Sequence, residues 1–252
     1  MEDLITSRAN PRFKDLLACL RASGTARTHT LLSGEKLIKT WREAPHAGRL
    51  AAELSLLVEG GEIPESIRDL RLPILALREK LMADLTESQS PPASALLMRL
   101  QPEQGGPMAR RVVVAMAIQD PGNLGAIFRS AAAFGFQEVL LGPGCADPFS
   151  PKALRGSMGA AFLLSIRRTE KLELDEAHWL ALDGGPGALP LAQADLSEPL
   201  RILVGNEGHG WKHESLPASV VRVAIPTTGV ESLNAAVAAG IACFESQRRM
   251  MR

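Results

Sequence analysis

Residues 112–118, VVVAMAI, form an uninterrupted apolar run near the middle of the chain. Such a run is typical of a β-strand that is buried on both faces, as the strands of parallel sheets are. It is followed by DPGNLGAIFRSA, residues 120–131, where a turn with two glycines leads into a helix of small residues expected at about 126–134. A buried strand, a turn and a helix in this order are the repeating unit of α/β proteins.

The rest of the C-terminal part repeats this alternation. Further apolar runs, each expected to be a strand, lie at 139–141, 162–166, 179–182, 202–204 and 221–225. Helical spacing predicts helices around 153–158 and from about 233 to 250. We therefore expect an α/β domain over residues 111–252, with a mainly parallel sheet and helices on both of its faces.

The first hundred residues predict a smaller, mixed α/β domain. The stretch QPEQGGP at 101–107 holds too much proline and glycine for either regular period, so we place a linker at 101–110. Helices are expected from Asn10 to near Gly24 and around 37–41, 63–70 and 79–85, and strands at 54–58 and 72–77. Residues 1–100 then form the first domain and residues 111–252 the second.

The composition excludes wholesale disorder, because 46% of the 252 residues are hydrophobic and 22% are charged. No apolar run approaches the roughly 20 residues of a transmembrane helix. The first residues, MEDLITSRANPR, lack the apolar core of a signal peptide. The three cysteines have neither paired nor metal-binding spacing. We expect a cytoplasmic protein with reduced thiols.

Positive charge is concentrated at the start of the chain, although basic and acidic residues balance overall at 28 each. Residues 1–50 hold nine Lys or Arg against five Asp or Glu, which leaves a local net charge of +4. One interpretation is a basic face that follows a phosphate backbone. The other is the solvated surface of ordinary helices, and charge counting leaves both open.

Polar, glycine-containing turns follow three of the expected strands. The first, at 120–131, carries Asn123 and Arg129. The second, at 202–211, reads ILVGNEGHGW, and the third, at 225–240, reads IPTTGVESLNAAVAAG. Because ligands of open α/β sheets bind outside the carboxyl ends of the strands, a binding site is expected at these turns.

Each of these segments has an ordinary structural explanation when it is taken alone. A single arginine such as Arg129 on a helix is commonly a surface ion-pair residue, and Ser232 fits the N-cap of the last helix. The second segment runs G-x-x-G-x-G, the reverse of the dinucleotide-binding order, which disfavours a nucleotide-dependent oxidoreductase. Asn234 is harder to explain structurally, because asparagine is a poor helix former.

Together the three segments resemble the motifs of the SpoU-type, TrmH-like RNA ribose methyltransferases of the SPOUT superfamily. The matching residues are Asn123, Arg129, Gly205, Glu207, Gly208, Gly210, Ile225, Pro226, Ser232, Leu233 and Asn234. The stretch DPFSPKALRGSMGA at 147–160 is similar to the family's mid-domain segment, so the resemblance covers about 111–252. Residues 1–100 resemble, more loosely, the family's substrate-binding domain of the ribosomal-protein type. The third motif departs from the family pattern at Thr227, commonly methionine, and at Ala235-Ala236, commonly Val-Ser.

The resemblance implies transfer of a methyl group from S-adenosylmethionine to a ribose 2′-hydroxyl of rRNA or tRNA, without a metal. It also implies an α/β domain with a deep trefoil knot, and a homodimer with its sites near the interface. The competing hypothesis is a non-catalytic RNA-binding or ribosome-assembly factor on the same fold. The presence of Arg129, Glu207 and Asn234 counts against that hypothesis.

The resemblance further implies roles for individual residues. The catalytic set is Arg129, Asn123, Glu207, Ser232 and Asn234, and the cofactor is held around Gly205, Ile225 and Leu233. In the family, the residue matching Arg129 is proposed to accept the proton of the ribose hydroxyl. Arginine normally stays protonated, however, and its planar fork is suited to gripping a phosphate beside the target nucleotide. Both roles stay open at the level of the sequence.

Overall fold

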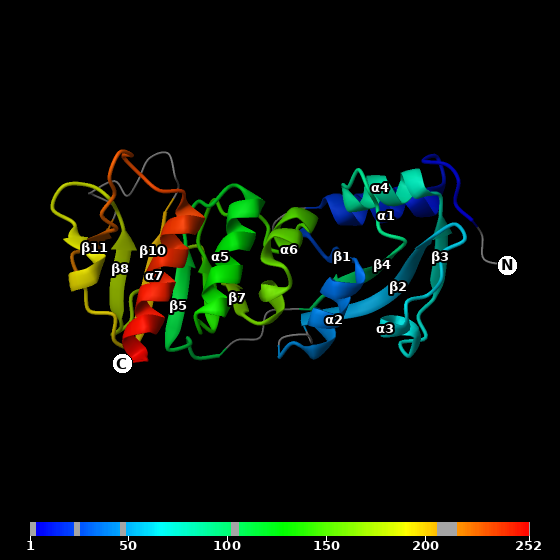
Figure 1. Cartoon of the computed structure of the whole chain (residues 1–252). Helices are drawn as coiled ribbons and strands as arrows, with labels where there is room; N and C mark the ends of the chain where they lie inside the picture. Colours follow the sequence, from blue (N-terminus) through cyan, green and yellow to red (C-terminus); the bar gives the residue numbers. More distant parts are fainter. Residues whose placement is uncertain (1–3, 23–25, 46–48, 102–105, 206–215, 252) are drawn as a thin grey trace. The chain divides into compact units, whose positions relative to one another are not determined.

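The computed structural model, shown in Figure 1, describes residues 4–22, 26–45, 49–101, 106–205 and 216–251. It divides into two units. The first comprises residues 1–104 together with 149–155, and the second comprises residues 105–148 and 156–252.

The first unit is built on a four-stranded mixed sheet in the order β1-β4-β2-β3. Strand β4 (Ser94–Leu100) pairs antiparallel with β1 (His29–Ser33) and with β2 (Leu50–Val58), and β2 pairs parallel with β3 (Ile74–Leu77). The helices are α1 (Pro11–Arg21), α2 (Glu35–Glu43), α3 (Glu65–Arg68) and α4 (Glu79–Thr86). Apolar residues of α1 and α4 share one core with residues of the sheet.

The sequence pattern does not predict β1 and β4. In β4 the run SALLM, residues 94–98, is wholly buried. Its leucine, alanine and methionine favour a helix at least as much as a strand. The segment is nevertheless a strand, because it lies between two hydrogen-bonding partners in the middle of the sheet.

The second unit contains a seven-stranded sheet in the order β7-β6-β5-β10-β8-β11-β9, and every pairing in it is parallel. Its strands are β5 (Arg111–Ala115), β6 (Glu138–Leu141), β7 (Ser165–Arg168), β8 (His178–Leu182), β9 (Leu189–Pro190), β10 (Leu200–Val204) and β11 (Val221–Ala224). Strands β5, β6 and β10 are buried along their whole length, as continuous apolar runs predict. The expected α/β domain with a parallel sheet is confirmed.

Two regions of this unit show clear differences from the predicted strands. Strand β5 ends at Ala115, although the apolar run continues to Ile118, which is itself buried. The chain leaves the sheet at Ala117, which has a left-handed φ of 55°. The strand expected at 162–166 lies at 165–168, and Ala160–Phe162 forms a short 3₁₀-helix before it.

The long helices of this unit, α5 (Pro121–Ala133) and α7 (Ala235–Met250), pack against each other. Their approach is close, because a Cβ atom at Gly240 would lie 3.1 Å from the hydroxyl oxygen of Ser130. The shorter helix α6 spans Pro151–Ser157.

Both long helices begin elsewhere than predicted, and their N-caps explain why. Helix α5 begins at Pro121 rather than near 126, since the Asp120 carboxylate accepts the Asn123 N–H and proline suits the first helical position. Helix α7 begins after Asn234, whose side chain accepts the N–H groups of residues 236 and 237. The N-cap of α7 is therefore Asn234 and not Ser232.

The expectation of helices on both faces of the parallel sheet stays a prediction, because residues 206–215 lie outside the described residues. A buried cluster from β5, β6, β8 and β10, which includes Val112, Leu140 and Trp179, contains no residue of α5 or α7. It is packed instead by non-helical chain such as Leu172 and Leu174. The trefoil knot implied by the resemblance involves the segment after β10, and residues 206–215 of that segment lie outside the described residues.

Candidate active site and cofactor pocket

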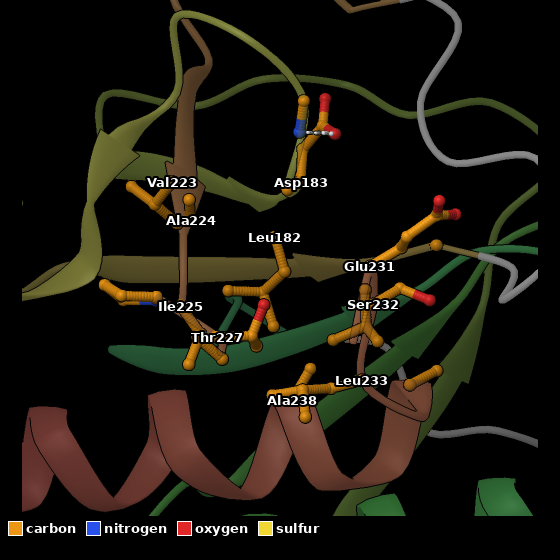
Figure 2. Close-up of a pocket in the computed structure, with 16 residues that line it drawn as sticks. Leu182, Asp183, Val223, Ala224, Ile225, Thr227, Glu231, Ser232, Leu233 and Ala238 are labelled. Atoms are coloured by element: carbon orange, nitrogen blue, oxygen red, sulfur yellow. Dashed lines mark hydrogen bonds between the residues drawn. The ribbon is translucent and has the colours of Figure 1, made fainter. Parts of the chain in front are cut away.

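A pocket of about 470 Å³ opens at the carboxyl ends of three neighbouring strands, β10, β8 and β11. The loops that leave these strands form most of its wall, and the first turns of α7 complete it. Its lining residues are Leu182, Asp183, Gly184, Gly185, Val204, Gly205, Val223, Ala224, Ile225, Pro226, Thr227, Glu231, Ser232, Leu233, Ala235 and Ala238. Figure 2 shows Leu182 and Ile225 beside Ala238 of α7, with Glu231 and Ser232 at one side.

The structure brings the three predicted cofactor residues to this pocket. Gly205 follows β10 directly, Ile225 follows β11 directly, and Leu233 lies just before α7. Gly205 and Ile225 are thus at the carboxyl ends of strands that β8 separates in the sheet. Whether they hold a cofactor stays a prediction, but their placement around one cavity is what such a role requires.

The segment between β11 and α7 contains a tight turn. The Thr227 hydroxyl donates to the Val230 carbonyl oxygen at 3.0 Å, and Gly229 between them has a left-handed φ of 80°. This tight turn leads into Glu231 and Ser232, which are exposed and line the pocket. Thr227, one of the two departures from the family pattern, therefore uses its hydroxyl to close the turn.

Asn123 and Asn234 meet although 111 positions separate them. The Asn234 Nδ2 group donates to Asn123 Oδ1 at 3.2 Å. The orientation of the Asn234 amide is determined by capping, because its Oδ1 accepts the N–H groups of Ala236 at 3.0 Å and Val237 at 3.2 Å. Its nitrogen is left to face Asn123, so the hydrogen bond joins the first and third motifs.

Arg129 lies on α5, six positions after Asn123. Its side chain is exposed, and within the described part of the chain it has neither a hydrogen bond nor an ion pair. The start of α5 is held tightly, since a Cβ atom at Gly156 would lie 3.3 Å from the Gly122 carbonyl oxygen and 3.5 Å from the Gly125 Cα. The helix that carries Asn123 and Arg129 is therefore rigidly placed, while the guanidinium is open to a ligand. Glu207 lies outside the described residues.

Sequence reasoning missed the loop after β8. Asp183, Gly184 and Gly185 line the pocket, and they follow a strand that was predicted from its apolar run. The Asp183 carboxylate accepts the Arg222 Nε–H at 2.6 Å and the Gly185 N–H at 3.0 Å. The signal was available, because a polar, glycine-rich turn after a buried strand is the criterion that selected the other three segments.

The pocket fits S-adenosylmethionine, which combines a flat adenine, a ribose and a charged methionine part. Its volume lies in the range of about 300–1,000 Å³ that is usual for small-molecule sites. The apolar side chains of Leu182, Val223 and Ile225 suit a flat ring, and exposed backbone at Gly184 and Gly205 suits polar edges. Among the described lining residues, Glu231 is an acid with no ion-pair partner, and it suits a positively charged ligand.

Two absences concern the described residues only. No group of three or more His, Cys, Asp or Glu side chains is placed there to bind a metal ion. Nor does any helix in the described ranges have the length and apolar character needed to cross a bilayer.

Comparisons with known proteins agree with this geometry. The model of the SpoU rRNA Methylase family matches residues 110–244. The 23S rRNA (guanosine(2553)-2′-O)-methyltransferase RlmP of Bacillus subtilis is 32% identical over 250 residues, which cover 95% of this chain and 97% of that protein. A crystal structure of an RNA 2′-O ribose methyltransferase superposes with a TM-score of 0.81 at 30% identity, over 99% of this chain and 100% of the other. An AdoMet-bound rRNA methyltransferase from Sinorhizobium meliloti shares the fold, with a TM-score of 0.81 at 24% identity over 99% of both chains.

The chain belongs to the SpoU rRNA methylase family. It is thus an RNA ribose 2′-O-methyltransferase of the kind that uses S-adenosylmethionine as methyl donor.

Proposed function

We propose that the chain methylates a guanosine ribose in the 23S rRNA, in the cytoplasm. The observation that carries this proposal is the extent of the similarity to RlmP, which spans 95% of this chain and so includes the first unit as well as the family domain. A shared methyltransferase domain alone supports only the reaction, whereas a shared first unit supports a shared substrate.

Mapping 2′-O-methyl groups in rRNA and tRNA from cells with and without this protein tests the proposal. We expect one guanosine of 23S rRNA to lose its methyl group in the cells that lack the protein. Loss of a tRNA methyl group instead would contradict the substrate. Unchanged methylation of all RNA, together with RNA binding in vitro, would favour the non-catalytic assembly factor.

For the cofactor, we propose that the backbone around Gly205, Ile225 and Leu233 holds S-adenosylmethionine in the pocket described above. When bound, it supplies a methyl group on a positively charged sulfur. Direct displacement at that methyl requires in-line placement of the ribose hydroxyl and a route for its proton. The Ser232 hydroxyl lines the pocket and is exposed, which supports contact with the substrate ribose. By the resemblance alone, Glu207 is proposed to help position the RNA.

Arg129 is proposed to grip a phosphate next to the target nucleotide. Its exposure and its lack of a partner among the described residues support a side chain that waits for a ligand. A guanidinium stays protonated and offers a planar pair of donors to two phosphate oxygens. Asn123 and Asn234 support this arrangement by fixing the start of α5 against the start of α7.

The variant Arg129→Lys separates this role from proton abstraction. If Arg129 grips a phosphate, the lysine variant loses the fork and its rate falls similarly at every pH. A pH–rate profile shifted well to the acid side would instead identify Arg129 as the base, because lysine deprotonates more easily than arginine. Arg129→Ala should lose on the order of a hundredfold in rate in either case. Full activity of the alanine variant would contradict both roles.

The first unit is proposed to supply RNA affinity. Of the basic residues in its first fifty positions, Lys39 and Arg42 are paired with acids, at 2.7 Å and 2.5 Å. Arg12, Lys14 and Arg21 on α1 are exposed and, as far as the structure describes their surroundings, form no ion pair. Exposed basic side chains on one helix are suited to a phosphate backbone.

A homodimer is proposed through the outer face of α7. Val237, Ile241 and Phe244 recur at helical spacing and are 51%, 37% and 50% exposed, which is a high exposure for a row of apolar side chains. The same helix contributes Ala235 and Ala238 to the pocket, so a second copy seated on this face would lie near the site. Sedimentation analysis of Ile241→Glu should show a monomer, and an unchanged dimer would exclude this interface.

A further inference from the structure

The loop that follows β8 is built around a side chain of the neighbouring strand. Arg222 of β11 extends into this loop, where its Nε–H donates to Asp183 Oδ2 at 2.6 Å and its Nη1 donates to the Pro186 carbonyl oxygen at 3.2 Å. The other carboxylate oxygen of Asp183 accepts the Gly185 N–H at 3.0 Å. The Asp183–Arg222 ion pair thus binds the backbone of the loop at two places, the Gly185 N–H and the Pro186 carbonyl oxygen.

The backbone at Gly185 lies close against the Arg222 side chain. A Cβ atom there would lie 2.5 Å from Arg222 Nη2 and 3.2 Å from Asp183 Oδ1. A side chain at position 185 would therefore have to displace the guanidinium of Arg222, which packs against this backbone. The same backbone, at Gly184 and Gly185, is part of the pocket wall.

Because both side chains are largely buried, this ion pair is a weak source of folding stability. The side chains of Asp183 and Arg222 are only 10% and 18% exposed, so both charges have lost most of their water. Desolvation of that kind cancels much of the attraction in an ion pair, and apolar residues of similar size are often as stabilising. The pair instead determines the geometry of the loop, because its donors and acceptors hold backbone groups at defined positions beside the pocket.

We infer that Asp183 and Arg222 are positioning residues for the methyl donor. They hold the backbone of Gly184 and Gly185 as one wall of the pocket, and they act on the affinity for S-adenosylmethionine and not on the chemical step. The inference rests on the proposed function, since it takes the occupant of the pocket to be S-adenosylmethionine. It adds residues that carry no family motif and that do not themselves transfer protons or touch RNA.

The test compares Asp183→Asn with a matched control, Glu198→Gln, in the full-length chain. Glu198 also pairs with an arginine, Arg110 at 2.7 Å, and its side chain is 18% exposed. It precedes β10, at the amino end of that strand, whereas the pocket lies at the carboxyl ends of the strands. Both substitutions turn a partly buried, paired acid into an amide, so a general effect of losing an ion pair appears in both.

The readouts are the dissociation constant for S-adenosylmethionine by calorimetry, the KM for each substrate, kcat and the melting temperature. For Asp183→Asn we expect weaker S-adenosylmethionine binding by about tenfold or more, the scale of one hydrogen bond to a charged group, and an equal rise in its KM. The KM for RNA and the kcat at saturation should change less than about twofold, as expected when only ground-state binding is lost. Glu198→Gln should leave the dissociation constant unchanged.

A second pair of variants keeps the test decisive if Asp183→Asn does not fold. Arg222→Lys retains a charge that reaches Asp183, whereas Arg222→Gln does not, so the lysine variant should bind S-adenosylmethionine more tightly than the glutamine variant. Equal affinity of these variants and the control, with lowered melting temperatures only, would overturn the inference and leave the proposed function intact. A wild-type chain that binds no S-adenosylmethionine would contradict the proposed function itself.

Discussion

The hydrogen bond between Asn123 and Asn234 can be tested with two substitutions of Asn234, which should affect folding stability and catalytic rate differently. Asn234 has two roles in one side chain: its oxygen caps α7, and its nitrogen donates to Asn123 at 3.2 Å. Asn234→Ala removes both roles. Asn234→Asp keeps an acceptor for the cap, and places a negative charge at a helix N-terminus, where it is favourable. It removes only the donor to Asn123.

The expected magnitudes follow from these contacts. Loss of an asparagine N-cap costs about 1 kcal/mol, which for a chain of this size lowers the melting temperature by about 2–4 °C. Asn234→Ala should show that decrease, and Asn234→Asp should not. In the aspartate variant, an oxygen faces Asn123 Oδ1 in place of the donor, so the two helix starts separate or Asn123 rotates. Misplacement of catalytic groups by about 1 Å costs up to about a hundredfold, and we expect kcat to fall by about 10- to 100-fold in both variants.

The assay is transfer of a labelled methyl group to rRNA, measured beside thermal unfolding. Asn10→Ala is the matched control, because Asn10 caps α1 in the first unit by accepting the Arg12 N–H at 2.9 Å. It should lower stability without lowering kcat. Full kcat in Asn234→Asp would refute the reasoning, and so would a rate loss in Asn234→Ala no larger than that in Asn10→Ala.

Three further predictions use other parts of the molecule. Gly205→Trp should fill the pocket and abolish S-adenosylmethionine binding while RNA affinity persists. Undiminished methyl transfer by this variant would show that the pocket does not bind the methyl donor. Replacing the three exposed basic residues of α1 by glutamine should weaken RNA binding and flatten its salt dependence, with calorimetric cofactor affinity unchanged. Arg248 and Arg249 lower the pKa of Glu245 from 4.5 to about 2, so its stabilisation exists above pH 4.5 and disappears as the pH falls toward 2. The melting temperature of Glu245→Gln should accordingly lie below wild type at neutral pH and converge with it in acid.

The parallel sheet was predictable because its strands β5, β6 and β10 are buried along their whole length. The apolar runs at β5, β6, β8 and β10 stand out against glycine-rich turns, and no other element type explains short runs of that kind so well. The same turns located the segments that border the pocket, since a ligand of such a sheet binds where its strands end, and the family resemblance singled out Gly205, Ile225 and Leu233 within them.

What could not be predicted depends on contacts between distant residues. Strand β4 lacks β-branched residues in its buried run, and only its two partners make it a strand. The start of α7 depends on which polar side chain reaches the free N–H groups, and the sequence pattern favoured Ser232 where the structure has Asn234. The pairing of Asp183 with Arg222 requires β8 and β11 to be neighbours, which no local pattern reveals.

The order of the strands explains why the substrate residues and the cofactor pocket lie where they do. From β5 the chain builds outward through β6 to β7, and then adds β8, β9, β10 and β11 on the other side of β5, with β10 next to β5. The point where the order reverses lies between β5 and β10, and such a point opens a crevice at the carboxyl ends of the strands. Asn123 and Arg129 follow β5 on one side of that crevice, and Gly205 follows β10 on the other. The ribose site that we propose beside Arg129 would therefore adjoin the pocket at Gly205, and the Asn123–Asn234 hydrogen bond joins the helix that carries Arg129 to the helix that closes the pocket.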